Sequence, residues 1–196
     1  ANEKYVAAAT AASVVGEGGV GKFSKIELGK KLAGKVVGVS PWISSLQEGI
    51  SGSASPEDVQ TLFELIYAYF TAPRQDSTAF QAFQTRMKGS IQNRSARPEA
   101  AFGDTIQVTL AQHHYRARPL SLELLDEMDL AASMAVYQDR FADAGDFSFF
   151  FVGNFTLEQM EPLVRTYLGG LPAAGRQETW RNVGIEPPEG VVEKTV

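Results

Sequence analysis

The sequence predicts an α+β fold, a two-layer sandwich in which long helices cover a mostly antiparallel sheet. Three observations carry this prediction. Two strand-like segments are neighbours near residues 35–52, helical patterns follow one another from residue 55 to 143, and an apolar run lies at 147–152. A parallel sheet would instead need strands and helices in regular alternation.

The first elements are a helix, a short helix and two strands. Apolar residues recur at helical spacing from Tyr5 to Val15, and a glycine-rich stretch separates them from a second helix at about 24–32. Val, Ile and Ser residues interrupted by glycine then predict strands at about 35–39 and 43–52.

The clearest helix follows Ser55. Ser55 is placed as an N-cap, Pro56 takes the first helical position, and two acidic residues complete the first turn. The apolar residues behind it form one stripe of an amphipathic helix that ends at Pro73: Val59, Leu62, Phe63, Ile66, Tyr67 and Phe70. We expect this aromatic stripe to be core.

Three further helices are expected before residue 144. Their ranges are 80–91, 99–113 and 129–143, and Ser121 is expected to cap a turn before the last of them.

The chain from residue 147 onward predicts a strand, a turn and a helix. Every residue of Phe147–Val152 except Ser148 is apolar, which is typical of a central strand or one buried on both faces. Thr156 and Gln159 are spaced for a capping box, and Pro162 predicts a kink or a later helix start.

The composition excludes several classes of function. The chain has 196 residues, a net charge of −5 and no cysteine, so thiolate nucleophiles, disulfides and cysteine-ligated zinc are excluded. Nucleic-acid binding, which needs clustered Lys and Arg, is not expected. No apolar run approaches the ~18 residues of a membrane span.

We interpret the chain as a fragment of a longer polypeptide. A helical pattern begins at once, and the last residues, GVVEKTV, resemble the start of a strand. We expect a domain at 1–172. The proline-, glycine- and charge-rich residues that follow read as a linker, so 173–196 would be a linker and the start of the next domain.

One stretch matches a phosphate-binding motif. Gly16–Lys22, GEGGVGK, satisfies G-x-x-x-x-G-K, in which backbone amides and the lysine hold phosphates. However, Phe23 replaces the required Ser or Thr, and a helical segment precedes the loop instead of a strand. Nucleotide binding therefore remains only an alternative hypothesis, and a turn between helices explains the stretch better.

No other residues assemble a recognisable active site. His113 and His114 are adjacent, so they point about 100° apart on a helix and do not easily chelate one metal. Asp126, Glu127 and Asp129 are expected to form a solvated helix start. We therefore expect no catalytic, cofactor-binding or metal-binding residue in this chain.

Several stretches together resemble one peptidase family. They are GKFSKIELGKKLAGK, GISGSASPEDVQTLFELIYAYFTAPRQDSTAFQAF, VYQDRFADAGDFSFFFVGNFTLEQMEPLVRTYLGGLP and RQETWRNVGIEPPEGVVEKTV. The chain is thereby similar to a half-domain of the pitrilysin/insulinase zinc metallopeptidases, which include mitochondrial processing peptidase. The third stretch, with its strand, glycine turn and helix, is the most specific.

The resemblance implies a role without catalysis. In that family, four related domains enclose a peptide-degrading chamber, and the first carries H-x-x-E-H. The matching helix here has no His, and the only acid of this stretch, Glu17, is expected past the end of the helix. We therefore expect the third, non-catalytic domain of a bacterial member, inactive alone, with zinc held in the catalytic domain of the parent protein.

Partners and location follow from the same resemblance. The expected partners are the other domains of the same polypeptide and a peptide or small protein substrate. An alternative is a non-catalytic subunit that assists a separate peptidase chain. The resemblance favours the periplasm, with the cytoplasm as the alternative.

Overall fold

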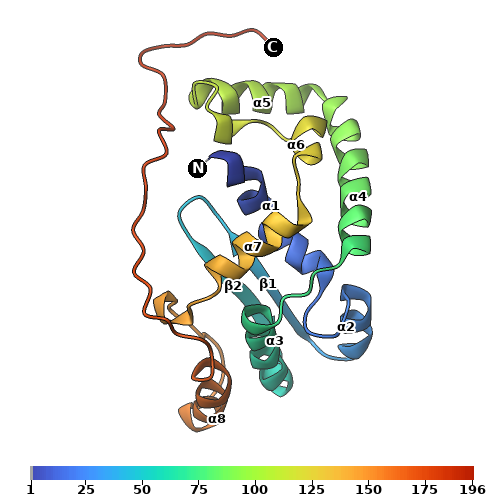
Figure 1. Ribbon diagram of the computed structural model, residues 1–196, viewed down its shortest axis with the longest axis vertical. Coiled ribbons are helices and arrows are strands. Elements are labelled where there is room, and N and C mark those ends of the chain that lie inside the picture. The colour runs from blue at the N-terminus through green and yellow to red at the C-terminus, as the bar shows by residue number, and fades with distance from the viewer. Residues whose placement is uncertain (1) are drawn as a thin grey trace.

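The computed structural model describes residues 2–196 and confirms the α+β class (Figure 1). One two-stranded antiparallel sheet accompanies a set of helices that includes short 3₁₀ turns. The helices are η1 (Asn2–Lys4), α1 (Tyr5–Gly18), α2 (Lys25–Lys31), η2 (Pro56–Asp58), α3 (Val59–Thr71), α4 (Ser77–Ser95), α5 (Pro98–Leu110), η3 (Tyr115–Ala117), α6 (Leu122–Asp126), α7 (Leu130–Arg140), η4 (Ala144–Asp146), α8 (Leu157–Leu163) and the π-helix η5 (Val164–Leu168).

The sheet is a hairpin of β1 (Val37–Ile43) and β2 (Glu48–Ala54), paired from Val37 with Ala54 to Ile43 with Glu48. The predicted strand bounds were therefore wrong. Residue 43 ends the first strand instead of beginning the second, because Ser44 and Gln47 close a tight connection. The Ser44 amide donates to the Gln47 carbonyl at 2.7 Å, and the Gln47 amide donates to Ser44 Oγ at 3.1 Å.

The main core lies where α1, α3 and α7 meet the hairpin. Its largest fully buried side chains include Tyr137 and Phe141, whose rings stack with centroids 4.4 Å apart. The predicted apolar stripe on α3 is confirmed, with Phe63 and Phe70 buried. Figure 1 shows α7 crossing the hairpin and α1 near the centre of the molecule.

A second, smaller cluster joins α1 to α4 and α6. It contains Val6, Val14, Ile91, Leu125 and Met128. The α4 helix supplies Ile91, and the helical spacing of the apolar residues within 80–91 predicted this helix.

Several predicted helix starts are confirmed by their caps. Ser24 and Thr156 each complete a capping box, and the Ser121 and Asp129 side chains accept from amides of α6 and α7. Ser55 is the exception, because its hydroxyl donates to Asp58 Oδ2 at 2.9 Å and makes no cap hydrogen bond.

Two helices end before the predicted residue. The α5 helix ends at Leu110, not 113, because Gln112 and His113 have positive φ values of 48° and 57°. The α7 helix ends at Arg140, before the predicted 143.

Pro162 lies inside α8 and changes the type of helix. A proline has no amide hydrogen to donate and crowds the preceding turn. The chain continues after it as the π-helix η5, up to Gly169. The predicted disturbance therefore takes the form of a change in hydrogen-bond spacing.

The predicted strand at Phe147–Val152 is wrong in this structure. These residues belong to no helix or strand, and Phe150 and Val152 are 87% and 99% exposed. Their pattern requires neighbours on both sides, and the hairpin does not extend to them. Residues 173–196 also form no helix or strand, and they run along one side of the molecule (Figure 1).

Candidate functional site

A groove lies between β2 and the segment 146–155, and we call it the sheet groove. Its volume is about 1420 Å³. Ligand pockets for small molecules usually span ~300–1,000 Å³, so the groove has room for a larger occupant. Side chains of α3, including Leu62, Ile66 and Phe70, contribute to its lining, and residues 178–181 and 183 form a further wall.

The β2 strand packs closely against α3 and β1. A Cβ atom at Gly52 would come within 2.8 Å of Leu62 Cδ1 on α3, and one at Gly49 within 2.6 Å of the Trp42 ring. Both glycines therefore allow close approach. Because β1 pairs with one edge of β2, the other edge has no strand beside it in the described sheet.

The opposite wall, 146–155, is attached to the core by alternate aromatic side chains. The Phe151 ring stacks on Phe63 with centroids 4.9 Å apart, and the Phe147 ring meets the edge of Phe70 at 5.0 Å. In sequence, Phe150 lies between these two anchors and Val152 follows the second one, and both side chains are exposed. The segment is therefore fixed on one face and apolar on the other.

The main chain of this wall makes few internal bonds. The Phe147 amide donates to the Ala144 carbonyl at 3.2 Å, but within residues 2–196 the main chain of 148–155 forms no hydrogen bond to another main-chain group. Backbone amides and carbonyls are obligatory hydrogen-bonding groups, so here they face solvent or a potential partner.

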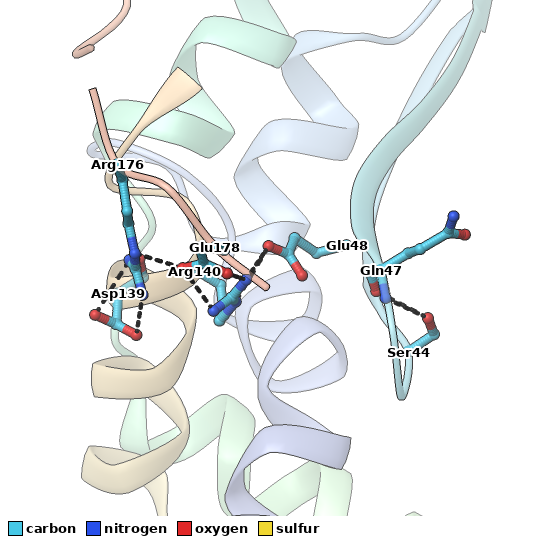
Figure 2. Close-up of polar contacts among 7 residues, drawn as sticks. All are labelled: Ser44, Gln47, Glu48, Asp139, Arg140, Arg176 and Glu178. Carbon is cyan, nitrogen blue, oxygen red and sulfur yellow. Dashed lines mark hydrogen bonds and ion pairs between the residues drawn. The ribbon is translucent and has the colours of Figure 1, made fainter. Parts of the chain in front are cut away.

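An ion-pair network joins three residues that line the groove, Glu48, Arg140 and Glu178 (Figure 2). Arg140 of α7 donates through Nε to Glu48 Oε1 at 3.1 Å and through Nη1 to Glu178 Oε1 at 3.0 Å. Burial disfavours the charge of Arg140, but the hydrogen bonds to Glu178 and Glu48 outweigh this effect and raise the pKa of Arg140. Three segments distant in sequence are therefore joined by one guanidinium.

Arg176 and Asp143 extend this attachment. Arg176 donates to the Asp139 carbonyl at 2.7 Å and also pairs with Glu178. The buried Asp143 carboxylate accepts from the amides of Arg176 at 2.6 Å and Gly145 at 2.9 Å, and these bonds lower the pKa of Asp143. Together these contacts hold residues 176–183, which we call the C-terminal strap, against α7.

The structure gives the Gly16–Lys22 stretch a different role from a phosphate loop. The helix α1 precedes it, and its amides already donate to protein carbonyls. Gly19 donates to Val15 at 3.1 Å, Val20 to Phe23 at 3.1 Å, and Gly21 to Ala72 at 2.7 Å. Bonded in this way, the amides are not available to cradle phosphate groups.

The histidines and clustered acids do not converge on a site. His114 Nδ1 accepts from the Arg116 amide at 3.1 Å and caps a turn, while His113 lies in the left-handed region after α5. Glu127 pairs with Arg118 at 2.5 Å, and Asp129 caps α7.

A zinc site does not fit the residues of 2–196. No group of three or more His, Asp or Glu side chains there could hold a metal ion. Glu17 lies within α1 and not past its end as expected, because the helix continues to Gly18. Its carboxylate is already paired with Lys25 at 2.7 Å and Arg86 at 2.6 Å.

Among the same residues, no helix is long and apolar enough to cross a membrane.

Sequence reasoning missed the residues that shape the groove. Glu48 and Arg140 are 92 positions apart, and no local spacing connects them. Trp42 and Trp180 both line the groove, yet neither belongs to an apolar stripe. The apolar run at 147–152 was the one local signal of this region.

Comparison by sequence finds no match, either among protein-family profiles or among curated proteins. Solved structures do match. The periplasmic protease PqqL from Escherichia coli aligns over 96% of this chain with a TM-score of 0.74 and 20% identity. The ferredoxin protease FusC, solved with Arabidopsis ferredoxin, aligns over 91% with a TM-score of 0.71 and 16% identity.

A third match is a conserved protein from Enterococcus faecalis, with 98% of this chain aligned, a TM-score of 0.68 and 15% identity. These matches show that the chain shares its fold with part of each of these proteins. The chain spans 21% of PqqL and 19% of FusC, so it corresponds to about a fifth of each, and to 49% of the Enterococcus protein.

Proposed function

We propose that the chain is a non-catalytic domain of a bacterial zinc metallopeptidase, and that it forms part of the wall of a chamber that encloses peptides. The observation that carries this proposal is the match to PqqL over 96% of the chain at a TM-score of 0.74. FusC, a second protease, supports it independently. The zinc would lie in another domain, because Glu17 is the only acidic residue on α1 and is already paired with two cations.

The proposed boundaries are those of the sequence analysis. Residues 1–172 would form the domain, and 173–196 would connect it to the next one. The proposed partners are the other domains of the same polypeptide and a peptide or small protein substrate. We propose a periplasmic location, as PqqL is periplasmic.

A second arrangement is a non-catalytic subunit that pairs with a separate peptidase chain. The Enterococcus protein supports it, since this chain covers 49% of that protein, a larger share than of PqqL or FusC. In both arrangements the chain alone would not hydrolyse peptides.

The test is to determine the coding sequence on both sides of this chain, and then to purify the complete product. We expect H-x-x-E-H upstream, about one zinc per polypeptide, and peptide hydrolysis that is lost when the motif glutamate becomes Gln. Glu17→Gln is the matched control and should leave kcat unchanged.

Two results would contradict the proposal. One is hydrolysis or stoichiometric zinc binding by residues 1–196 alone. The other is a complete product without zinc that also activates no separate zinc peptidase from the same organism.

A further inference from the structure

We infer that the sheet groove receives an extended β-strand from a part of the same polypeptide outside residues 1–196, and that this strand completes a sheet between β2 and the segment 147–152. The inference shares with the proposed function only the premise of a longer polypeptide. It does not depend on zinc or on hydrolysis.

The first step is the conflict between pattern and structure at 147–152. Five of six consecutive residues are apolar, a pattern typical of strands with neighbours on both faces and both edges. The backbone is extended at Phe147, with φ −92° and ψ 142°, yet Phe150 is 87% exposed and Val152 99%. The sequence is therefore suited to a sheet position that residues 2–196 do not complete.

The second step is that two edges without partners face one groove. The β2 strand is paired on one side only, and the main chain of 148–155 has no main-chain partner among the described residues. Seven β2 residues span about 24 Å and six residues of the segment about 20 Å at ~3.4 Å per residue. One inserted strand of six or seven residues matches both lengths and offers donors and acceptors to both edges.

The third step concerns the kind of occupant. The groove volume of about 1420 Å³ exceeds that of small-molecule pockets, which are ~300–1,000 Å³. Its lining is apolar along α3 and along Phe147, Phe149 and Phe151. Permanent interfaces are more hydrophobic than transient ones, so a permanent strand fits this lining better than a peptide that is released.

The fourth step concerns the source of the strand. This chain corresponds to 21% of PqqL and 19% of FusC, so proteins of this fold have ample further chain that could supply it. A strand from the same polypeptide also has a high effective concentration at the groove, whereas a free peptide must overcome the entropy of association.

The test compares amide hydrogen exchange in the complete gene product and in residues 1–196 alone. We expect the amides of 148–152 to exchange at least about a hundredfold more slowly in the complete product, because they become bonded within a sheet. The internal reference is α3, whose amides should be protected in both samples. Equal exchange at 148–152 in both samples would overturn the inference, as would a natural product that consists of residues 1–196 only.

A second measurement identifies the strand. In the complete product, a segment outside residues 1–196 should gain protection together with 148–152. A synthetic peptide with its sequence should bind residues 1–196 saturably and change the fluorescence of Trp180 in a Trp42→Phe background, since both tryptophans line the groove. Equal binding by a scrambled peptide, or formation of a dimer of residues 1–196 that protects 148–152 without the peptide, would contradict the inference.

Phe150→Asp should have different effects in residues 1–196 alone and in the complete product. In residues 1–196 the side chain is 87% exposed, so Tm should not change. In the complete product the same substitution should lower Tm and restore fast exchange at 148–152. An unchanged Tm and exchange rate there would contradict the inference, whereas zinc content and hydrolysis report separately on the proposed function.

Discussion

Phe63 of α3 and Phe150 of the 147–152 segment have opposite environments. Phe63 lies on α3 and is fully buried, whereas the side chain of Phe150 is 87% exposed. Both belong to strongly apolar stretches of the sequence. An apolar pattern therefore indicates that a segment is suited to burial. Whether the segment is buried depends on the presence of neighbouring elements that can cover it.

The helical side of the molecule also supplies a partner for a buried main-chain carbonyl that its own helix leaves free. The carbonyl of Tyr69 would normally accept from the amide four residues on, but that residue is Pro73, which has none. The Tyr137 hydroxyl donates to this carbonyl at 3.1 Å inside the core. No comparable partner serves the main chain of 148–155 within residues 2–196.

The largest expected effect comes from truncating one phenylalanine on each side. Phe63→Ala should lower the free energy of unfolding of residues 1–196 by about 3–5 kcal/mol, because it leaves a cavity in the core. Phe150→Ala should change it by no more than ~0.5 kcal/mol, as at other exposed positions. Urea unfolding followed by circular dichroism measures both, and equal losses would remove the contrast between the two regions.

A smaller loss is expected when the buried hydroxyl of α7 is removed. Tyr137→Phe keeps the ring stacked on Phe141 but leaves the Tyr69 carbonyl without a donor. A buried group left unsatisfied costs ~1–3 kcal/mol. Tyr67→Phe is a suitable control, since its ring is only partly buried. The account would be wrong here if Tyr137→Phe were as stable as the unmodified chain.

Removal of the cation that holds the C-terminal strap should have a local effect. Arg140→Gln breaks the contacts with Glu48 and Glu178. We expect the free energy of unfolding to fall by about 1 kcal/mol. Hydrogen bonds to charged groups contribute ~1.5–3 kcal/mol when well buried and less when partly exposed. Limited proteolysis should accelerate within the strap.

The matched control is Arg165→Gln. Arg165 forms an exposed ion pair with Glu161, with 78% and 67% of the two side chains exposed. Such pairs contribute ~0–1 kcal/mol, so stability and cleavage of the strap should not change. Faster cleavage of the strap in this control would show that Arg140 has no special role.

The smallest expected effect is a dependence of strap attachment on pH. Amides of Arg176 and Gly145 lower the pKa of Asp143, so the folded state binds its proton less readily than the unfolded state. The stabilisation is therefore complete above the ordinary aspartate pKa of ~3.9 and is lost as the pH falls through the lower, folded value.

Urea unfolding at pH 7 and pH 3 checks this dependence. Asp143→Asn should destabilise the chain at pH 7 and make the difference between the two pH values smaller. A pH dependence that is unchanged in this variant would assign the effect to other carboxylates.

Local signals explain which elements could be predicted. The starts of α2, α6, α7 and α8 follow from Ser24, Ser121, Asp129 and Thr156, whose side chains accept from amides three residues away. The stripe on α3 follows from its own spacing. These elements need no information from distant parts of the chain.

Some elements were mispredicted because a nearby side chain formed a different contact, and others because they depend on distant partners. The hairpin bounds shifted because Ser44 and Gln47, three residues apart, set the connection, and Ser55 bonds to Asp58 instead of capping a helix. The network at the groove joins Arg140 to residues 92 and 38 positions away. The run at 147–152 was read correctly as apolar, but its predicted burial requires neighbours that the described residues do not provide.

The measurement that tests this contrast most directly is residue-resolved amide hydrogen exchange on residues 1–196 at neutral pH. The account predicts that amides of α3 and α7 exchange only through global unfolding, whereas those of 148–152 exchange close to the rate of an unstructured chain. Protection of 148–152 equal to that of α3 would contradict it, because the segment would then already be paired within this chain.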